Sequence, residues 1–397
     1  MITSQGDEFK DPGIYVGTGG LLLYFYKKIK YLQMMREDLE ETKESFDICF
    51  ETNLELWKHQ KMSKKQIPSF FMGMPGILTI GYLFYHEFGN ESRAYECLSH
   101  ICNYAEMPLE ESEILYGHAG LLYCLLLIKD NNPECAKVDK YIFQVTLELI
   151  QHGIDNFDEL GVDQDKKTLY YDFPHRQGAN YLGAAHGVMG IVYLVLKAFE
   201  FIPLQDIPQA CFRVIKNTCN EIAGMQTEEG NFPMARESLV SDLVHFCHGA
   251  PGAIPFLLKC HEFYEDKKFL IAALKAGELV ITKGILKKGN NLCHGISGNV
   301  YCLMNIYSHL REMYEGEGDP DADKDILKWK INAYKIAHAT YIKNIQIRCV
   351  KYRDPTRKVR GIPDTVYSLM EGRMGCAVMY LDILTNEHNM KFPGYEI

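Results

Sequence analysis

Two triplets of cysteine, histidine and glycine hold the residues of this chain best suited to binding a metal ion. They are Cys247-His248-Gly249 and Cys293-His294-Gly295, and each opens a Gly-x-x-Gly turn that leads into an apolar run. Thiolate and imidazole are common ligands of zinc, and three protein ligands with an open fourth position are typical of catalytic zinc. In a loop before a helix, Cys293 and His294 could both reach one ion, with Cys247 as the third ligand.

Three histidines occupy equivalent places, because each directly precedes the first glycine of a turn: His186, His248 and His294. Equivalent positions in a repeat face the same part of the fold. We therefore predict that His186 faces the same site, with a histidine hydrogen-bonded into a polar core as the alternative. Spacing alone would also nominate His248 as a fourth ligand. His118 lies inside an earlier turn, where a core histidine is the simpler interpretation.

The turns that carry these residues recur along the whole chain. Seven copies of Gly-x-x-Gly begin at Gly17, Gly73, Gly117, Gly187, Gly249, Gly295 and Gly372. Glycine suits such a turn because it permits positive φ and lets two backbones approach closely. Each turn is followed by a mostly apolar run that could begin a buried helix; the runs are residues 21–26, 77–85, 121–128, 191–196, 253–258, 299–306 and 376–384.

Charged, amphipathic stretches separate the apolar runs. Their apolar residues recur at spacings of three and four, which predicts helices; the stretches are residues 34–61, 92–105, 137–153, 209–223 and 325–345. The repeated unit is then an amphipathic helix, a loop, a turn and an apolar helix, in one all-α domain over residues 1–397. The pattern does not separate an open superhelix from a closed ring, but strongly apolar second helices favour a ring that buries them as an inner layer.

Composition excludes several classes of protein. The net charge of −10 argues against a general nucleic-acid binder, which needs a basic surface. No apolar stretch approaches the roughly 18–20 residues that span a bilayer, and the polar start of the chain predicts no signal peptide. The 13 cysteines then predict reduced thiols in the cytoplasm, while association with a membrane surface stays open.

Several motifs together carry a family resemblance. They are the seven turns, Gly183-Ala-Ala-His186-Gly187, Cys247-His248-Gly249, Leu292-Cys293-His294-Gly295, Pro363-Asp364-Thr365, Ser368-Leu369-Met370-Glu371-Gly372 and the ending Phe392-Pro393-Gly394-Tyr395-Glu396-Ile397. With these motifs the chain resembles the lanthionine synthetase C-like proteins of eukaryotes over essentially its whole length. The resemblance implies a double-layered α/α toroid and zinc held by Cys247, Cys293 and His294.

The resemblance also implies glutathione as the thiol substrate. Relatives on this branch add it to dehydroalanine or dehydrobutyrine residues of proteins. A free thiol is mostly protonated at neutral pH, so metal coordination would supply the nucleophilic thiolate. Attack on the β-carbon creates an enolate that needs stabilisation and then a proton, the role expected of His186.

Glutathione carries two carboxylates, so its site should be basic. Lys288 matches a family position associated with glutathione binding and catalysis, and Lys287 is the neighbouring alternative. The family places an arginine where this chain has Gly361, so the displaced Arg360 is expected to make that contact. Arg373, inside the seventh turn, is a further expected contact.

Weaker candidates lie elsewhere along the chain. Lys10 is the closest match to a basic glutathione contact near the start, and Arg236 could reach the active face. Asp172 and His175 stand where the family has an acidic residue and a histidine, although a structural loop role is at least as good an interpretation.

The sequence leaves three functions open. The first is a zinc-dependent enzyme that adds glutathione to dehydroamino acids in proteins. The second is a signalling adaptor that binds zinc, glutathione and a signalling-protein partner without turnover, which a harmless Cys247→Ala substitution would favour. The third is a lanthipeptide cyclase, which would normally be encoded beside a precursor peptide and a dehydratase. Resemblance of fold does not decide among them.

Overall fold

The described part of the chain is all-helical. The computed structural model describes residues 10–159, 167–173, 179–238, 242–286, 288–314, 320–341 and 365–397, with one isolated antiparallel bridge between Tyr181 and Ala235. Within these residues, no helix combines the length and the apolar character needed to cross a bilayer. The predicted all-α class is confirmed.

The chain divides into two compact units. Unit 1 comprises Met1–Gln60, Val244–Phe246 and Gly277–Phe392, and unit 2 comprises Lys61–Leu243, Cys247–Ala276 and Pro393–Ile397. Each unit therefore combines segments that are distant in the sequence.

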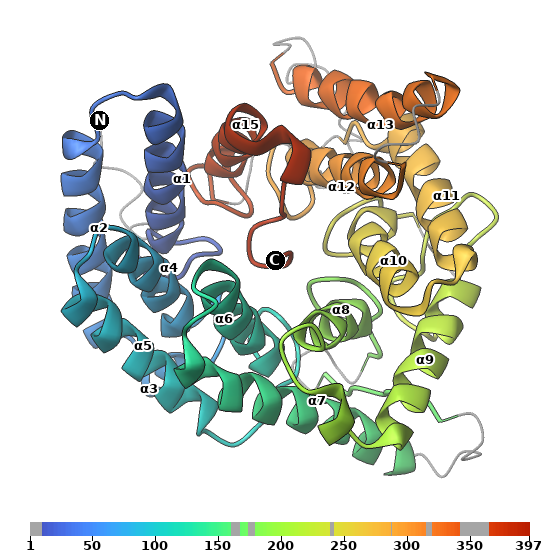
Figure 1. Ribbon diagram of the computed structural model, residues 1–397, viewed down its shortest axis with the longest axis horizontal. Coiled ribbons are helices and arrows are strands. Elements are labelled where there is room, and N and C mark those ends of the chain that lie inside the picture. Colours follow the sequence, from blue (N-terminus) through green and yellow to red (C-terminus); the bar gives the residue numbers. More distant parts are fainter. Residues whose placement is uncertain are drawn as a thin grey trace, which may run out of the picture. The chain divides into compact units, whose positions relative to one another are not determined.

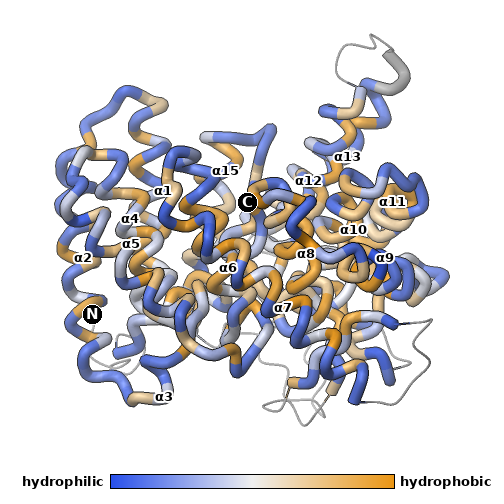
Figure 2. Tube along the Cα trace, turned by 60° about the horizontal axis from the view of Figure 1, so that its bottom comes forward, coloured by the Kyte–Doolittle hydropathy of each residue, from blue (hydrophilic) through white to orange (hydrophobic). Residues whose placement is uncertain are grey.

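Unit 2 has two layers of helices. The inner helices are α4 (Met74–Glu87), α6 (His118–Asn131), α8 (Val188–Ala198) and α10 (Ala250–Tyr264), and they are buried over most of their residues. The outer helices are α5 (Glu91–Ala105), α7 (Asp139–Glu159) and α9 (Gln209–Gly224), which bury only one face. Figure 1 shows the inner helices along an arc with the outer helices on its outer side, and Figure 2 shows α8 as a mainly hydrophobic segment. A short helix, α3 (Met62–Lys65), precedes α4.

Unit 1 repeats the arrangement with fewer helices. The apolar helices α1 (Gly19–Met35), α12 (Ile296–Tyr314) and α15 (Arg373–Asn386) pack against one another through α15. The amphipathic helices α2 (Glu40–Lys58) and α13 (Pro320–Ala339) cover α1 and α12 respectively. The remaining long helix, α11 (Lys267–Lys283), contributes residues to both units.

The seven predicted turns each begin an inner helix. At the fifth turn glycine is required twice over, because Gly249 adopts a φ of 107° and an added Cβ would lie 2.0 Å from the carbonyl oxygen of Leu243. A left-handed φ and such a close backbone contact both disfavour any other residue. The turn therefore determines where the loop that contains Cys247 and His248 ends and where α10 begins.

Two predicted boundaries were wrong. The stretch 34–61 was expected to form one helix, but α1 runs to Met35 and ends at Arg36, whose left-handed φ of 58° caps the helix through hydrogen bonds from Arg36 and Glu37 to Gln33 and Leu32. A new helix, α2, then starts at Glu40. Helix α11 lies in none of the predicted stretches. Of the stretch 325–345, the helix ends at Ala339, and residues 342–345 lie outside the described residues.

Residues 393–397 pack into the interior of unit 2. Tyr395 is fully buried, with its ring centroid 4.6 Å from that of Tyr193, and its hydroxyl donates to the Gly252 carbonyl at 3.3 Å. Gly394 lies so close to the Phe71 ring that an added Cβ would stand 2.1 Å from it, with φ at 81°. This segment therefore completes the core between inner helices of the unit.

Candidate active site

Cys293 and His294 are held in the loop that precedes α12 in unit 1. The Cys293 side chain is buried, and its sulfur accepts a hydrogen bond of 2.8 Å from the Tyr15 hydroxyl. Its backbone N–H donates to the carbonyl of Met370 at 2.9 Å, and the His294 N–H donates to the Asn291 side chain at 3.0 Å. Both residues are thus fixed by polar contacts, although they belong to no helix.

Nearby charges act on the histidines of unit 1. Burial opposes protonation of His294, but its hydrogen bond to Cys293 and the charge interaction with that thiol outweigh this, so the pKa of His294 is raised. For His245, burial and then the charges of Lys288 and His294 lower the pKa to about 3, so this ring is neutral at neutral pH. The rings of His245 and His294 lie 6.0 Å apart. The charge of Lys288 therefore acts on both rings.

In unit 2, His186 is paired with an acidic side chain that sequence reasoning missed. The Nδ1 atom of His186 lies 2.6 Å from a carboxylate oxygen of Glu113, and both side chains are largely buried, at 12% and 5% exposure. Glu113 comes from the loop before α6, and His186 from the loop before α8. The pair fixes the orientation of the imidazole, with Nε2 as the ring nitrogen opposite the carboxylate.

Aromatic rings surround this pair. The His248 ring lies 6.1 Å from that of His186 with the planes 27° apart, and Tyr116 stacks near His186 at 6.5 Å. Tyr181 approaches His248 at 5.3 Å. The loop before the fourth turn packs closely against the backbone of Cys247, because a Cβ added at Gly183 would lie 2.0 Å from the Cys247 carbonyl oxygen. Cys247, His248 and His186 thus share one wall of unit 2.

Among the described residues, three side chains with metal-binding atoms lie close together. The ligand atoms of Cys247, Cys293 and His294 all lie within 4.8 Å of one another. Bonds of about 2.3 Å to sulfur and about 2.1 Å to nitrogen would separate tetrahedral ligand atoms by about 3.5 to 3.8 Å. The group could therefore hold a metal ion, and its thiol and imidazole donors are of the kind that zinc accepts. These are the three predicted ligands, while His248 is not part of the group.

Only some of the predicted basic contacts with glutathione lie within the described residues. Arg373 begins α15 and is exposed, with its N–H donating to the Val366 carbonyl at 2.9 Å. Lys10 is also exposed. Arg360, Gly361, Lys287 and His175 lie outside the described residues.

Of the weaker candidates, Arg236 makes contacts within the described chain, whereas Asp172 is exposed. Arg236 pairs with Glu221 at 2.9 Å and donates to the Leu169 carbonyl at 2.8 Å, which indicates a structural role. His118 is buried, and burial lowers its pKa.

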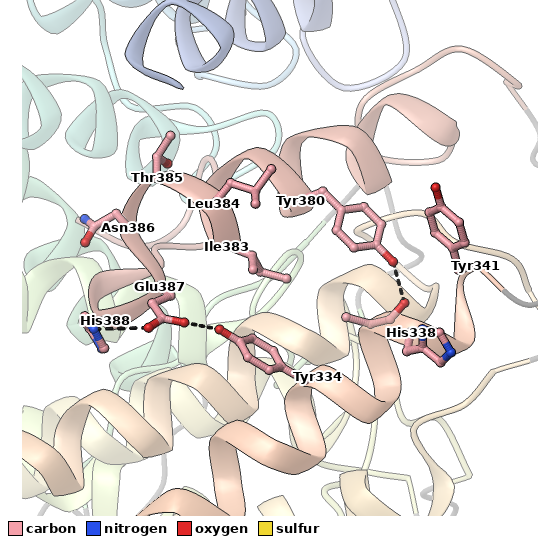
Figure 3. Close-up of a pocket in the computed structure, with 11 residues that line it drawn as sticks. Tyr334, His338, Tyr341, Tyr380, Ile383, Leu384, Thr385, Asn386, Glu387 and His388 are labelled. Atoms are coloured by element: carbon pink, nitrogen blue, oxygen red, sulfur yellow. Dashed lines mark hydrogen bonds and ion pairs between the residues drawn. The ribbon is translucent and has the colours of Figure 1, made fainter. Parts of the chain in front are cut away.

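A separate cavity in unit 1 contains none of the predicted site residues. It has a volume of about 780 Å³ and lies between α13 and the end of α15. Figure 3 shows Tyr334 directed toward Glu387, and Tyr380 donates to the Ala337 carbonyl at 2.8 Å. The hydroxyls of Tyr334 and Tyr380 and the carboxylate of Glu387 already have partners within the chain.

Three comparisons with known proteins agree with these observations. The profile of the family described as lanthionine synthetase C-like protein matches residues 8–397. A Danio rerio protein named glutathione S-transferase LANCL1 is 28% identical over 334 residues, which cover 83% of this chain and 74% of that protein. LanC-like protein GCL1 of Arabidopsis thaliana is 25% identical over 405 residues, covering 98% and 82%.

Among solved structures, nisin cyclase matches with a TM-score of 0.65 at 16% identity, covering 95% of this chain and 90% of that one. At this identity the likeness shows the fold alone, and it agrees with the predicted toroid class. The family profile spans nearly all of the chain and includes the inner-helix turns described above. This chain therefore belongs to the lanthionine synthetase C-like protein family.

Proposed function

We propose that this protein binds zinc and glutathione and adds the glutathione thiol to dehydroalanine or dehydrobutyrine residues of polypeptides. The observation that carries the proposal is the Cys247, Cys293 and His294 group, whose donor set suits zinc with an open fourth position. A relative named as a glutathione S-transferase supports glutathione as the thiol.

The metal would be held by the two thiolates and the imidazole. Zinc, when bound, would lower the pKa of the glutathione thiol and so keep its sulfur as a thiolate near neutral pH. The Tyr15 hydroxyl, 2.8 Å from the Cys293 sulfur, would hold that ligand in place.

His186 would deliver the proton, and Glu113 would orient His186. The addition forms a C–S bond to the β-carbon, moves the C=C electron pair into an enolate, and ends when the α-carbon takes a proton. We assign the delivery of this proton to Nε2 of His186, while the carboxylate of Glu113 holds Nδ1 at 2.6 Å. The proton that glutathione loses from its thiol balances the one that the product gains.

Basic side chains would bind the carboxylates of glutathione. Lys288 is the first candidate, because its charge already acts on His245 and His294. It would also offset the negative charge of the enolate. Arg373 and Arg360 are the further proposed contacts, the latter on the sequence prediction alone.

The test combines metal content with turnover. Zinc per chain and addition of glutathione to a dehydroalanine peptide would be measured for the wild type, Cys293→Ala and His186→Asn, with Cys376→Ala as a control thiol on α15 outside the metal group. We expect one zinc per chain in all but Cys293→Ala, and adduct only in the wild type and the control. Bound zinc and glutathione without adduct would instead favour the adaptor, and absence of zinc would overturn the proposal.

A further inference from the structure

Unit 2 contains a cavity that leads to the His186 pair without belonging to it. Its volume is about 760 Å³, within the range of about 300–1,000 Å³ usual for ligand sites. One side is formed by α3 and the loop before α4, and the other by the loop between α5 and α6. We call it the α3–α6 groove.

The groove is joined to the proposed catalytic residues by one aromatic ring. Tyr116 lines the groove, and the same ring lies 6.5 Å from the ring of His186 with the planes 19° apart. Tyr116 also follows Glu113 in the same loop. A molecule whose reactive carbon reached His186 would therefore have this groove beside it for the parts that do not react.

The lining combines apolar surface with a buried histidine. Met72, Met107 and Pro68 supply apolar contacts, and methionine adapts to side chains of different shape. His118 is 1% exposed, and its Nε2 atom lies 3.3 Å from the Met107 carbonyl, so Nε2 carries the hydrogen. Its Nδ1 atom is buried and has no hydrogen-bond partner in the described chain, so His118 contributes to the wall of the groove and not to its accessible surface.

The charge of the groove would favour binding of one proposed substrate over the other. Glu110 and Glu111 line one side of the groove, where Glu110 is exposed, and Lys64 lines the α3 side, so the lining carries one net negative charge. Glutathione, with two carboxylates, would be repelled by these residues and attracted instead to Lys288 in unit 1. A polypeptide with a lysine or arginine side chain would be attracted to them, since opposite charges at a partly buried surface favour each other.

From this geometry we propose that the α3–α6 groove holds the polypeptide that carries the dehydroamino acid, and that Glu110 and Glu111 select substrates with a basic side chain near that residue. The inference rests on the proposed function for the identity of the reactive group. It adds the class of polypeptide that the enzyme prefers and the surface that binds it.

The test measures binding without turnover. Two fluorescein-labelled dehydroalanine peptides that differ only in a lysine or a norleucine near the dehydroalanine would be titrated by fluorescence anisotropy without glutathione. The wild type should prefer the lysine peptide by about two- to five-fold for each carboxylate, and less at high salt. Glu110→Gln combined with Glu111→Gln should bind both peptides equally, with unchanged zinc content.

A matched control separates the groove from the general acidity of the chain. Glu134→Gln removes one carboxylate from an exposed position of unit 2 outside the groove, and should leave the preference intact. Charge reversal, with Glu110→Lys and Glu111→Lys, should give a preference for a glutamate peptide. Such a reversal would not follow from loss of folding.

The outcomes distinguish this inference from the proposed function. If the lysine preference survives in the double glutamine variant, or is absent in the wild type, the groove inference is wrong even where adduct forms. If the preference follows Glu110 and Glu111 but no adduct ever forms, polypeptide binding stands and the enzymatic proposal fails. Addition to a small dehydroalanine amide with no measurable binding of either peptide would also overturn the groove inference.

Discussion

At the scale of single residues, the site depends on partners that orient its reactive atoms. Glu113 orients His186 through a contact of 2.6 Å, and the Tyr15 hydroxyl contacts the Cys293 sulfur at 2.8 Å. Each contact joins residues far apart in sequence. Both partners are expected to act through the residue they touch, so they are positioning residues, and their substitution should leave different signatures.

Glu113→Gln keeps a side chain of the same shape but removes its charge. We expect the rate of adduct formation to fall by about 10²-fold, because general acid catalysis contributes about 10²–10⁴-fold, while zinc content and glutathione affinity stay unchanged. Steady-state kinetics across pH, with Glu134→Gln as control, would check this. An unchanged pH profile and rate would remove Glu113 from the mechanism.

Tyr15→Phe removes the hydrogen bond to the Cys293 sulfur. Loss of an outer contact to a metal ligand typically costs about 10- to 100-fold in metal affinity. Competition with a chromophoric chelator should therefore show weaker zinc binding by Tyr15→Phe, whereas Tyr24→Phe on α1 should match the wild type. Equal affinities for all three proteins would contradict the role of Tyr15.

Burial of His118 predicts a pH dependence of stability. Its pKa is lowered in the folded protein, mainly by burial, so the unfolded chain binds a proton more readily below its ordinary pKa of about 6.5. The free energy of unfolding should therefore fall as pH drops from about 7 toward 5. Urea denaturation of His118→Gln should show a smaller loss over this range than the wild type, and an identical loss would contradict the assignment.

At the scale of elements, the glycine turns fix where each inner helix begins. Gly249→Ala would force an L-residue to a φ of 107° and place a Cβ 2.0 Å from the Leu243 carbonyl oxygen. We expect a loss of at least about 1–3 kcal/mol in stability, together with weaker zinc binding because Cys247 lies in the same turn.

The control for this turn is Gly224→Ala at the end of α9. No atom lies within 4 Å of a Cβ added there, so alanine should be neutral or stabilising by up to about 1 kcal/mol. Thermal unfolding of both variants would measure the difference. Equal stability of the two would show that the fifth turn relaxes without cost.

The inner helices were predictable because a local signal, a glycine turn before an apolar run, marks each of them. The amphipathic helices have no such signal, and α11 was not predicted. The end of α1 depends on a left-handed conformation of Arg36, which cannot be predicted from the residue type. The three metal-binding candidates could be named from their types and places in the repeat. Glu113 could not, because its contact with His186 joins positions 73 residues apart, and because Glu110 and Glu111 stand in the same loop, so residue type alone does not single it out.

At the scale of the whole molecule, neither unit is a continuous stretch of chain. Whether the chain behaves as one domain over residues 1–397 therefore stays a prediction. A cooperative transition that includes unit 2 should depend on residues 393–397, since Tyr395 and Ile397 are buried.

Tyr395→Ala tests that dependence. Removing a buried aromatic side chain typically costs about 3–5 kcal/mol, so the melting temperature should drop clearly. Tyr367→Ala, at a tyrosine that is 55% exposed in unit 1, should change it little. Similar melting temperatures for the two variants would mean that residues 393–397 contribute little to the core.

The burial of residues 393–397 also has a consequence during synthesis. The partners of Tyr395 and Gly394, which are Tyr193, Gly252 and Phe71, leave the ribosome long before these residues do. At about 5–20 residues per second, the apolar place that Tyr395 fills stays open for several seconds while unit 1 is still being translated. The nascent chain would therefore display this surface to molecular chaperones until residues 393–397 have left the ribosome.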